Sequence, residues 1–131
     1  MRFLIVDDDE SALAYLETVL SPFAGCDAVL SGREALAAFD KAHAEGRPYD
    51  AVLMDILMPG MDGHQTAELL RAREEALGVD EFHAFKLVMV SSLVDDVNVT
   101  RAFFSTQAVC YLVKPLEKEK ILDELRQNLV I

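Results

Sequence analysis

Chemically active side chains follow four short apolar runs of this sequence. The runs cover residues 3–6, 51–54, 87–90 and 109–113. Directly after them come, in chain order, Asp7 with Asp8, then Asp55, Ser91 and Lys114. Apolar runs of this length, separated by stretches of helical periodicity, are typical of buried strands in a parallel sheet. Because ligand sites lie beyond the carboxyl ends of such strands, we expect these side chains to meet in one place.

The three carboxylates are suited to binding a hard cation. Carboxylates a few ångströms apart repel one another strongly unless a positive charge lies between them. Mg²⁺ takes carboxylate, water and phosphate oxygens as ligands. A single aspartate at a strand end often only caps the next helix. Capping alone does not explain two acids after one strand and a third after another, so Asp7, Asp8 and Asp55 are candidate magnesium ligands.

Lys114 adds a positive charge to this cluster. A lysine beside acids near a surface is often no more than a weak ion pair. Here Pro115 follows it and restricts the backbone at the strand end. A metal ion, a carboxylate nucleophile and an ammonium group together make a phosphoryl-transfer centre, in which the carboxylate attacks phosphorus in line. Ser91 would offer its hydroxyl to the transferred group.

Strand signals and helix signals alternate along the whole chain. We expect strands over residues 3–6, 28–30, 51–54, 87–90 and 109–113. We expect helices over 10–20, from the capping box of Ser31 and Glu34 to Gly46, over 65–76, from Asp95 or Asp96 onward, and over 117–129. This alternation predicts a doubly wound five-stranded parallel α/β sheet with five helices and right-handed crossovers.

Helical periodicity also predicts which side chains face the core. They are Leu13, Leu16, Leu20, Leu36, Phe39, Leu69, Leu70, Ile121, Leu122, Leu125 and Leu129. The stretch from Arg73 to Lys86 is less regular, and two interpretations of it stay open. Its aromatic side chains either pack over the edge of the sheet or form a small partner-binding surface.

Composition is typical of an acidic globular domain. The 131 residues are 52% hydrophobic, which is enough for one domain with a buried core. The 12 Lys and Arg against 23 Asp and Glu give a net charge of −11, which argues against nucleic-acid binding. No apolar run approaches the roughly 18 residues of a membrane helix, and we expect no signal peptide. We expect a single cytoplasmic domain over residues 1–131 with no output domain.

The cysteines and histidines lack the spacing of a metal site. Cys26 and Cys110 form no CxxC or CxxH pattern, so we expect two reduced, buried thiols. His43, His64 and His83 are scattered along the chain. We expect them to be solvent-exposed or at helix ends, and we assign them no role.

Four segments carry a resemblance to a known family. They are Val6-Asp7-Asp8, Met54-Asp55-Ile56-Leu57-Met58-Pro59-Gly60-Met61-Asp62-Gly63, Val90-Ser91-Ser92 and Tyr111-Leu112-Val113-Lys114-Pro115. In order and spacing they resemble the receiver domains of bacterial two-component response regulators, and the resemblance covers essentially the whole chain. The block after Asp55 is highly specific. The resemblance implies a flavodoxin-like receiver fold with strand order 2-1-3-4-5.

The resemblance implies a role for each residue of the acidic cluster. Asp55 would accept the phosphoryl group, and Lys114 would contact a phosphoryl oxygen. Asp8, Asp55 and the backbone carbonyl of Leu57 would bind Mg²⁺, with Asp7 acting through a water molecule. The chain would then be a phospho-accepting signalling protein rather than an enzyme, although it would catalyse its own phosphotransfer and a slow dephosphorylation.

The resemblance also implies a switch and two kinds of partner. Ser91 would move toward the phosphoryl group, and Tyr111 would swing inward behind it, shifting a balance between two existing conformers. A sensor histidine kinase or histidine phosphotransfer protein would supply the phosphoryl group. A downstream target would dock on the face formed by the fourth helix, fifth strand and fifth helix. We expect no nucleic-acid or membrane partner, and a monomer or weak dimer.

The implied strand order bears on the cysteines as well. Cys26 and Cys110 would lie on opposite edge strands, four spacings of about 4.8 Å or roughly 19 Å apart. A disulfide needs Cα atoms within about 7 Å. We therefore expect no internal bridge.

Several positions depart from the family pattern. Leu57 and Leu93 occupy the two variable positions that flank the site, and neither side chain can orient an attacking water, so we predict slow self-dephosphorylation. Ser92 stands where a small apolar residue is commoner. Residues 105–107 replace the usual Ala-Gly turn before the last strand, and the stretch from Arg73 to Lys86 is longer than usual.

Three other interpretations were weighed against this one. Asp7-Asp8-Asp9 resembles the Asp-x-Asp motif of haloacid-dehalogenase phosphatases, but no Thr or Gly follows it and Asp55 would have no function. A flavodoxin-like nucleotide or flavin binder shares the fold, but no glycine-rich phosphate loop follows the first strand. The third is a degenerate receiver that serves only as a scaffold, although all the chemical residues are present.

Overall fold

The apolar runs form a parallel sheet, as predicted. The computed structural model describes residues 1–131, and its strands are β1 (Arg2–Val6), β2 (Gly25–Val29), β3 (Ala51–Asp55), β4 (Lys86–Ser91) and β5 (Ala108–Val113). The helices are α1 (Glu10–Leu20), α2 (Gly32–Ala44), α3 (Gly63–Ala76), α4 (Asp96–Ser105) and α5 (Lys118–Gln127). All neighbouring strands pair in parallel in the order β2-β1-β3-β4-β5. The predicted α/β fold class and strand order are confirmed.

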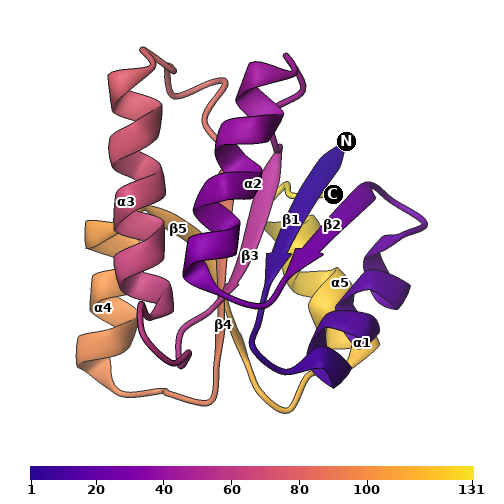
Figure 1. Ribbon diagram of the computed structural model, residues 1–131. Helices are drawn as coiled ribbons and strands as arrows, with labels where there is room; N and C mark the ends of the chain where they lie inside the picture. Colours follow the sequence, from indigo (N-terminus) through magenta and orange to yellow (C-terminus); the bar gives the residue numbers. More distant parts are fainter.

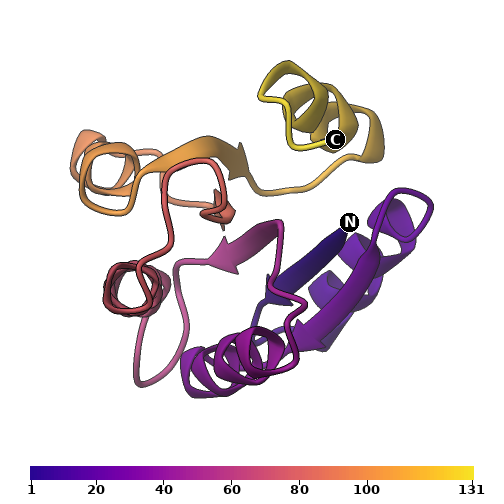
Figure 2. The ribbon, with the colours of Figure 1, turned by 90° about the horizontal axis from the view of Figure 1, so that it is seen from above.

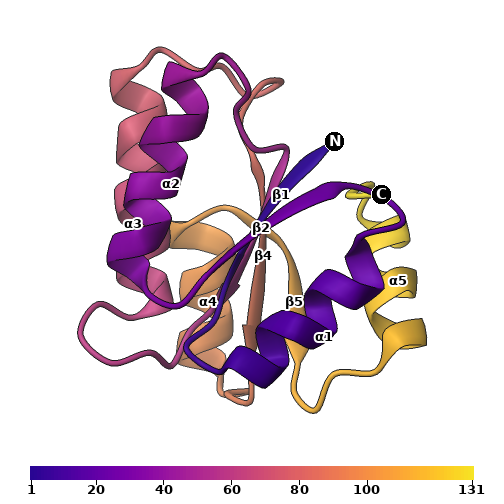
Figure 3. The ribbon, with the colours of Figure 1, turned by 45° about the vertical axis from the view of Figure 1, so that its right-hand side comes forward.

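Helices cover both faces of the sheet (Figures 1 and 2). Helices α2, α3 and α4 pack on one face through a core that includes Phe39, Leu70 and Ala102. Helices α1 and α5 pack on the other through a core that includes Leu16 and Leu125. Figure 3 shows the two helical layers on opposite sides of the twisted sheet. Since both faces are covered, β3 is buried along its whole length and β4 along all but its first residue, and polar side chains occur only at the ends of these two strands.

Two predicted core residues were wrong, and one strand has other bounds than predicted. Strand β2 covers 25–29 rather than 28–30, because this edge strand is only half-buried and carries no apolar run at its start. Leu69 is 44% exposed, since Leu70 is the leucine of α3 that faces the sheet. Leu129 is 75% exposed because α5 ends at Gln127 and the helical periodicity no longer applies beyond it.

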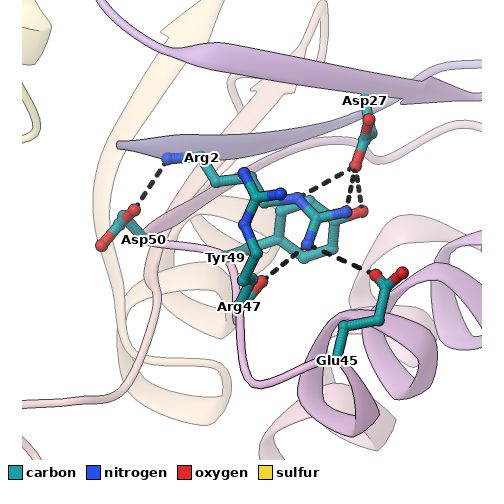
Figure 4. Close-up of polar contacts among 6 residues, drawn as sticks. All are labelled: Arg2, Asp27, Glu45, Arg47, Tyr49 and Asp50. Atoms are coloured by element: carbon teal, nitrogen blue, oxygen red, sulfur yellow. Dashed lines mark hydrogen bonds and ion pairs between the residues drawn. The ribbon is translucent and has the colours of Figure 1, made fainter.

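A polar cluster fastens the amino end of β1 to its neighbours (Figure 4). The guanidinium of Arg2 donates to Asp27 of β2 at 2.9 Å and to the carbonyl of Arg47 at 2.7 Å. Tyr49 donates its hydroxyl to the same Asp27 carboxylate at 2.7 Å, and this bond lowers the pKa of Asp27. The backbone amide of Arg2 donates to Asp50. The cluster lies at the opposite end of the sheet from the candidate site.

Arg71 organises the stretch that the sequence left open. Its guanidinium lies over the ring of Phe85 at 4.0 Å and donates to Glu74 at 2.7 Å and to the carbonyls of Phe85 and Thr106 at 2.8 and 2.9 Å. One arginine of α3 thus ties together the starts of β4 and β5. The packed-aromatic interpretation holds for Phe85, which is buried, but not for Phe82, which is 96% exposed.

The length and hydropathy of the five helices can be compared with what a membrane-spanning helix needs. None of the five combines the length and the hydropathy that crossing a bilayer requires.

Candidate functional site

The strand topology brings the predicted site residues to one edge of the sheet. Asp7 and Asp8 directly follow β1, Asp55 is the last residue of β3, Ser91 is the last residue of β4, and Lys114 directly follows β5. The loops that follow these strands lie at the lower edge of the molecule in Figure 1. This edge is the carboxyl end of a parallel sheet, where ligand sites of such folds form.

The three acids come within metal-binding distance of one another. One carboxylate oxygen each from Asp7, Asp8 and Asp55 lies within 4.8 Å of the others. Asp7 and Asp55 are buried, whereas Asp8 is exposed. The backbone amide of Asp9 donates to Asp7 at 2.9 Å, and Asp9 itself caps α1 by accepting from the amide of Ser11. The fourth acid of this region therefore serves the helix, and the other three form the cluster.

Lys114 reaches into the cluster from β5. Its Nζ donates to Asp7 Oδ2 at 3.0 Å and lies 3.3 Å from Asp55 Oδ1. Its backbone amide donates to the carbonyl of Ser91 at 3.0 Å, and the peptide bond to Pro115 is cis. The ammonium group thus contacts both buried carboxylates.

The electrostatics of the cluster favour a further cation. Three ionised carboxylates and one ammonium leave a formal charge of −3 + 1 = −2. Burial raises the pKa of Asp55 to about 7, the charge of Asp7 acts in the same direction, and Lys114 opposes both. Burial also opposes the charged form of Lys114, but the hydrogen bond to Asp7 and the charge of Asp55 outweigh it and raise the pKa of this lysine. A divalent ion would restore neutrality, and oxygen ligands are those Mg²⁺ prefers.

Ser91 and Tyr111 are joined through the loop after β4. The buried Ser91 hydroxyl accepts from the backbone amide of Leu93 at 3.1 Å. The Tyr111 hydroxyl donates to the carbonyl of the same Leu93 at 2.5 Å. In this arrangement Ser91 is bonded to its own loop rather than to the acids, and Tyr111 is anchored beside it.

The loop after β3 returns close to Asp55. Leu57, whose carbonyl the resemblance assigned to the metal, has a side chain that is 56% exposed. Gly63 then donates its amide to the Ile56 carbonyl at 2.8 Å. A Cβ at Gly63 would lie 2.1 Å from the carbonyl oxygen of Asp55, so only glycine allows this approach. Helix α3 therefore begins directly against the strand end that carries Asp55.

His64 is a buried polar residue to which the sequence assigned no role. It is the second residue of α3, as the helix-end expectation allowed, but it is only 1% exposed. Its Nε2 lies 3.0 Å from Asn98 Oδ1 of α4, and its Nδ1 has no hydrogen-bond partner. The sequence feature that could have indicated a special position for His64 is that it directly follows the Asp62-Gly63 pair at the start of α3.

Comparison with known families shows to which family this chain belongs. The model of the response regulator receiver domain matches residues 3–126. The chain belongs to the response regulator receiver domain family. Receiver domains are signalling modules of two-component systems that accept a phosphoryl group on an aspartate and bind Mg²⁺ in an acidic pocket. In this receiver that pocket is the cluster of Asp7, Asp8 and Asp55.

Similar proteins differ widely in length. The receiver is 34% identical over 123 residues to the two-component response regulator ORR41 of Oryza sativa subsp. japonica, covering 92% of this chain and 88% of that protein. It is 31% identical over 135 residues to hybrid signal transduction histidine kinase L of Dictyostelium discoideum, covering 96% of this chain but only 7% of that protein. A CheX–CheY–BeF₃–Mg²⁺ complex from Borrelia burgdorferi shares the fold with TM-score 0.83 and 24% identity, covering 100% of this chain and 90% of that one.

Proposed function

We propose that this receiver takes a phosphoryl group onto Asp55 from a sensor histidine kinase or a histidine phosphotransfer protein and signals by phosphorylation-dependent docking. One observation carries the proposal. Asp55 is the one carboxylate of the cluster that is the last residue of a central strand and lies beside both Lys114 and Asp7. Asp7 and Asp8 lie beyond the end of β1, and we assign them to binding the cation.

The residues around Asp55 support a direct transfer. A carboxylate oxygen of Asp55 attacks phosphorus, a P–O bond forms, the P–N bond to the donor imidazole breaks, and the imidazole nitrogen takes up a proton from solvent. Lys114, at 3.3 Å from Asp55 Oδ1, is positioned to contact a phosphoryl oxygen once the new bond forms. Asp8, Asp55 and the Leu57 carbonyl would hold Mg²⁺, with Asp7 acting through water. The bound ion supplies positive charge to the phosphoryl oxygens.

The switch would pass through the loop that joins Ser91 and Tyr111. A phosphoryl group adds roughly −1.5 to −2 charge and three acceptor oxygens. The Ser91 hydroxyl can leave the Leu93 amide and donate to one of them, which frees the loop to which Tyr111 is bonded. Two arrangements of one loop are thus available, and phosphorylation favours one of them.

The target would dock on the surface of α4, β5 and α5. Several apolar side chains of this surface and of the loop that leads into α4 are exposed: Val94, Val97, Phe104 and Val113. A pocket of about 190 Å³ lies between β5 and α5, and Tyr111 lines it. A change in Tyr111 therefore alters the docking surface directly.

We propose further that residues 1–131 form a single receiver domain. The alignment with ORR41, which spans 88% of that regulator, supports this organisation. The partners are then proteins recognised by docking, and the free receiver is a monomer or a weak dimer. We also propose that the receiver meets its phosphoryl donor in the cytoplasm.

Phosphoramidate, a small donor with a P–N bond, tests the transfer and the switch separately. The phosphorylated residue is trapped with borohydride and located by peptide mass spectrometry, and backbone amide shifts report the α4–β5–α5 surface. We expect modification at Asp55 and shift changes across that surface. In Ser91→Ala we expect modification to persist while the shift changes and phosphorylation-dependent target affinity are lost. Modification at another residue contradicts the transfer, and an unchanged response in Ser91→Ala contradicts the switch.

A further inference from the structure

His64 joins the helix beside Asp55 to the helix of the proposed docking surface. It lies in the first turn of α3, and Asn98 lies in the first turn of α4. Their side chains meet at 3.0 Å, between His64 Nε2 and Asn98 Oδ1. His64 is 1% exposed and Asn98 is partly buried, so the histidine side of this bond is shielded from water.

The neighbours of Asn98 determine which group donates. Its Nδ2 lies 3.0 and 2.8 Å from the two carboxylate oxygens of Asp95, the residue that caps α4. A carboxylate can only accept, so the amide nitrogen of Asn98 is the donor to Asp95 and the amide oxygen faces His64. His64 must therefore carry its proton on Nε2. In the neutral ring Nδ1 is then an acceptor, and it is buried without a partner.

A buried acceptor without a partner costs stability. A phenylalanine would fill the same position without this cost. What histidine provides here is therefore the bond to α4 rather than better packing. Buried polar atoms without a hydrogen-bond partner are unfavourable, and proteins tend to keep such features at functional positions.

The two helices joined by this bond differ in how firmly they are held. The start of α3 is fixed by the capping box of Asp62 and Gln65 and by the Gly63 amide, which donates to Ile56 beside Asp55. Helix α4 has one buried residue, Ala102. The other end of α4 is held by Arg71, which donates to the Thr106 carbonyl.

A second side-chain link between α3 and α4 is weaker. Arg101 of α4 donates to Glu68 of α3 at 3.0 Å, and both side chains are more than one-third exposed. An ion pair at such exposure contributes little. At the start of α4, the bond between the buried His64 and the partly buried Asn98 is therefore the stronger link to α3.

We propose that His64 is a positioning residue that holds the first turn of α4 and thereby sets the balance on which phosphorylation acts. The loop of Leu93, which bonds both Ser91 and Tyr111, leads directly into the Asp95 cap. As long as the His64–Asn98 hydrogen bond is present, the end of this loop that joins α4 is held in place. The effect on signalling rests on the proposed function. The His64–Asn98 bond itself is present without a phosphoryl group.

Hydrogen exchange of the unphosphorylated full chain tests the restraint. His64→Phe keeps an aromatic ring and removes the donor, and His64→Gln keeps an N–H donor near the Nε2 position. Because one hydrogen bond contributes about fivefold to tenfold in an equilibrium, we expect His64→Phe to raise exchange at residues 95–100 by about that factor. We expect the exchange rates in β1 and β3 to stay the same. The midpoint of thermal unfolding should be unchanged or higher. His64→Gln should restore most of the protection.

Asn98→Ala provides the matched partner variant. This variant loses the bond to His64 and also the bonds from Nδ2 to Asp95, so we expect it to raise exchange at the start of α4 by at least the same factor. Adding His64→Phe to Asn98→Ala should have no further effect, since the bond between the two side chains is then already absent. Unchanged α4 exchange in His64→Phe would overturn the proposal. So would a loss of protection spread over the whole sheet in both His64 variants, because that result indicates a purely structural role.

A second arm with phosphoramidate links the restraint to signalling. We expect phosphorylation to change the exchange of α4 less in His64→Phe than in the wild type, because the first turn of α4 is already freed from α3 in this variant. Full retention of that change would contradict the signalling consequence. If the wild type took up no phosphoryl group, the proposed function would fail, while the unphosphorylated comparison would still decide the role of His64.

Discussion

At the scale of single residues, Asp55 shows how the fold prepares a carboxylate for chemistry. Burial and the neighbouring Asp7 both disfavour its charged form, and Lys114 only partly compensates. Without a cation the pKa of Asp55 is therefore about 7, far above the usual value of 3.8. A carboxylate in this environment binds a proton or a metal ion more readily than an exposed one does.

This raised pKa gives the metal-free receiver a specific pH dependence. The folded chain holds the Asp55 proton more tightly than the unfolded chain, so this contribution to stability is full below about pH 4 and is lost as the pH rises through 7. At about 1.4 kcal/mol per pKa unit, we expect a loss of about 2–3 kcal/mol between pH 5 and 8. Urea unfolding in EDTA measures it.

Asp55→Asn is the matched control for that measurement, because asparagine has no proton to lose in this range. We expect the variant to lack this component of the pH dependence, and Mg²⁺ to stabilise the wild type at pH 8 more than the variant. Parallel pH profiles for wild type and Asp55→Asn in EDTA would show that the pKa of Asp55 is not raised.

Leu57 bears on the lifetime of the phosphorylated receiver. Its side chain is 56% exposed beside the cluster and cannot orient an attacking water. We expect the phosphorylated receiver to last minutes or longer. In Leu57→Asn a polar group can position water, and we expect loss of the phosphoryl group to accelerate about tenfold or more. Intact mass followed over time measures both rates, with Leu57→Met as the apolar control. A wild-type lifetime of seconds would refute the prediction.

At the scale of elements, local signals predicted some segments well and others poorly. Helix α1 has the predicted bounds because leucine spacing and an aspartate cap agree. The start of α3 at Gly63 precedes the predicted start at 65, since the cap is Asp62 and its box partner is Gln65. The first residues of β2 had no apolar signal, because an edge strand is held there by Arg2 and Asp27 rather than by burial.

Arg71 and Arg73 make a matched pair of tests on α3. Arg71 pairs with the buried Glu74 and donates to three backbone carbonyls, whereas Arg73 pairs with the exposed Asp40. Removing one partner of a buried pair costs about 3 kcal/mol or more, and removing an exposed one about 0–1 kcal/mol. We expect Arg71→Met to lower the free energy of unfolding by the larger amount and Arg73→Met by the smaller. Equal effects in urea unfolding would contradict the role given to Arg71.

At the scale of the whole molecule, the sequence predicted the convergence of the site but not the ties between helices. Strand ends can be read from apolar runs, and parallel topology then places Asp7, Asp55 and Lys114 together. The bond between His64 and Asn98 joins residues 34 positions apart on two helices. No local pattern encodes it, because it depends on how α3 and α4 pack against each other.

The sheet also keeps the two cysteines apart. Cys26 lies on β2 and Cys110 on β5, at opposite edges of the sheet, and both thiols are free. Burial raises the pKa of Cys26, and it raises that of Cys110 to about 11. We expect slow labelling by a thiol reagent in the native receiver and rapid labelling of both thiols after unfolding. Rapid native labelling of Cys110, or an internal disulfide under oxidising conditions, would contradict this arrangement.

The most direct test of the account is Mg²⁺-dependent phosphorylation by acetyl phosphate, read by intact mass, with Asp55→Asn alongside. We predict that the wild type gains the mass of one phosphoryl group, that EDTA prevents the gain, and that Asp55→Asn gains nothing. Equal gain in Asp55→Asn would show that another residue accepts the phosphoryl group. No gain in the wild type from either acetyl phosphate or phosphoramidate would contradict the central claim that this acidic cluster performs phosphoryl transfer.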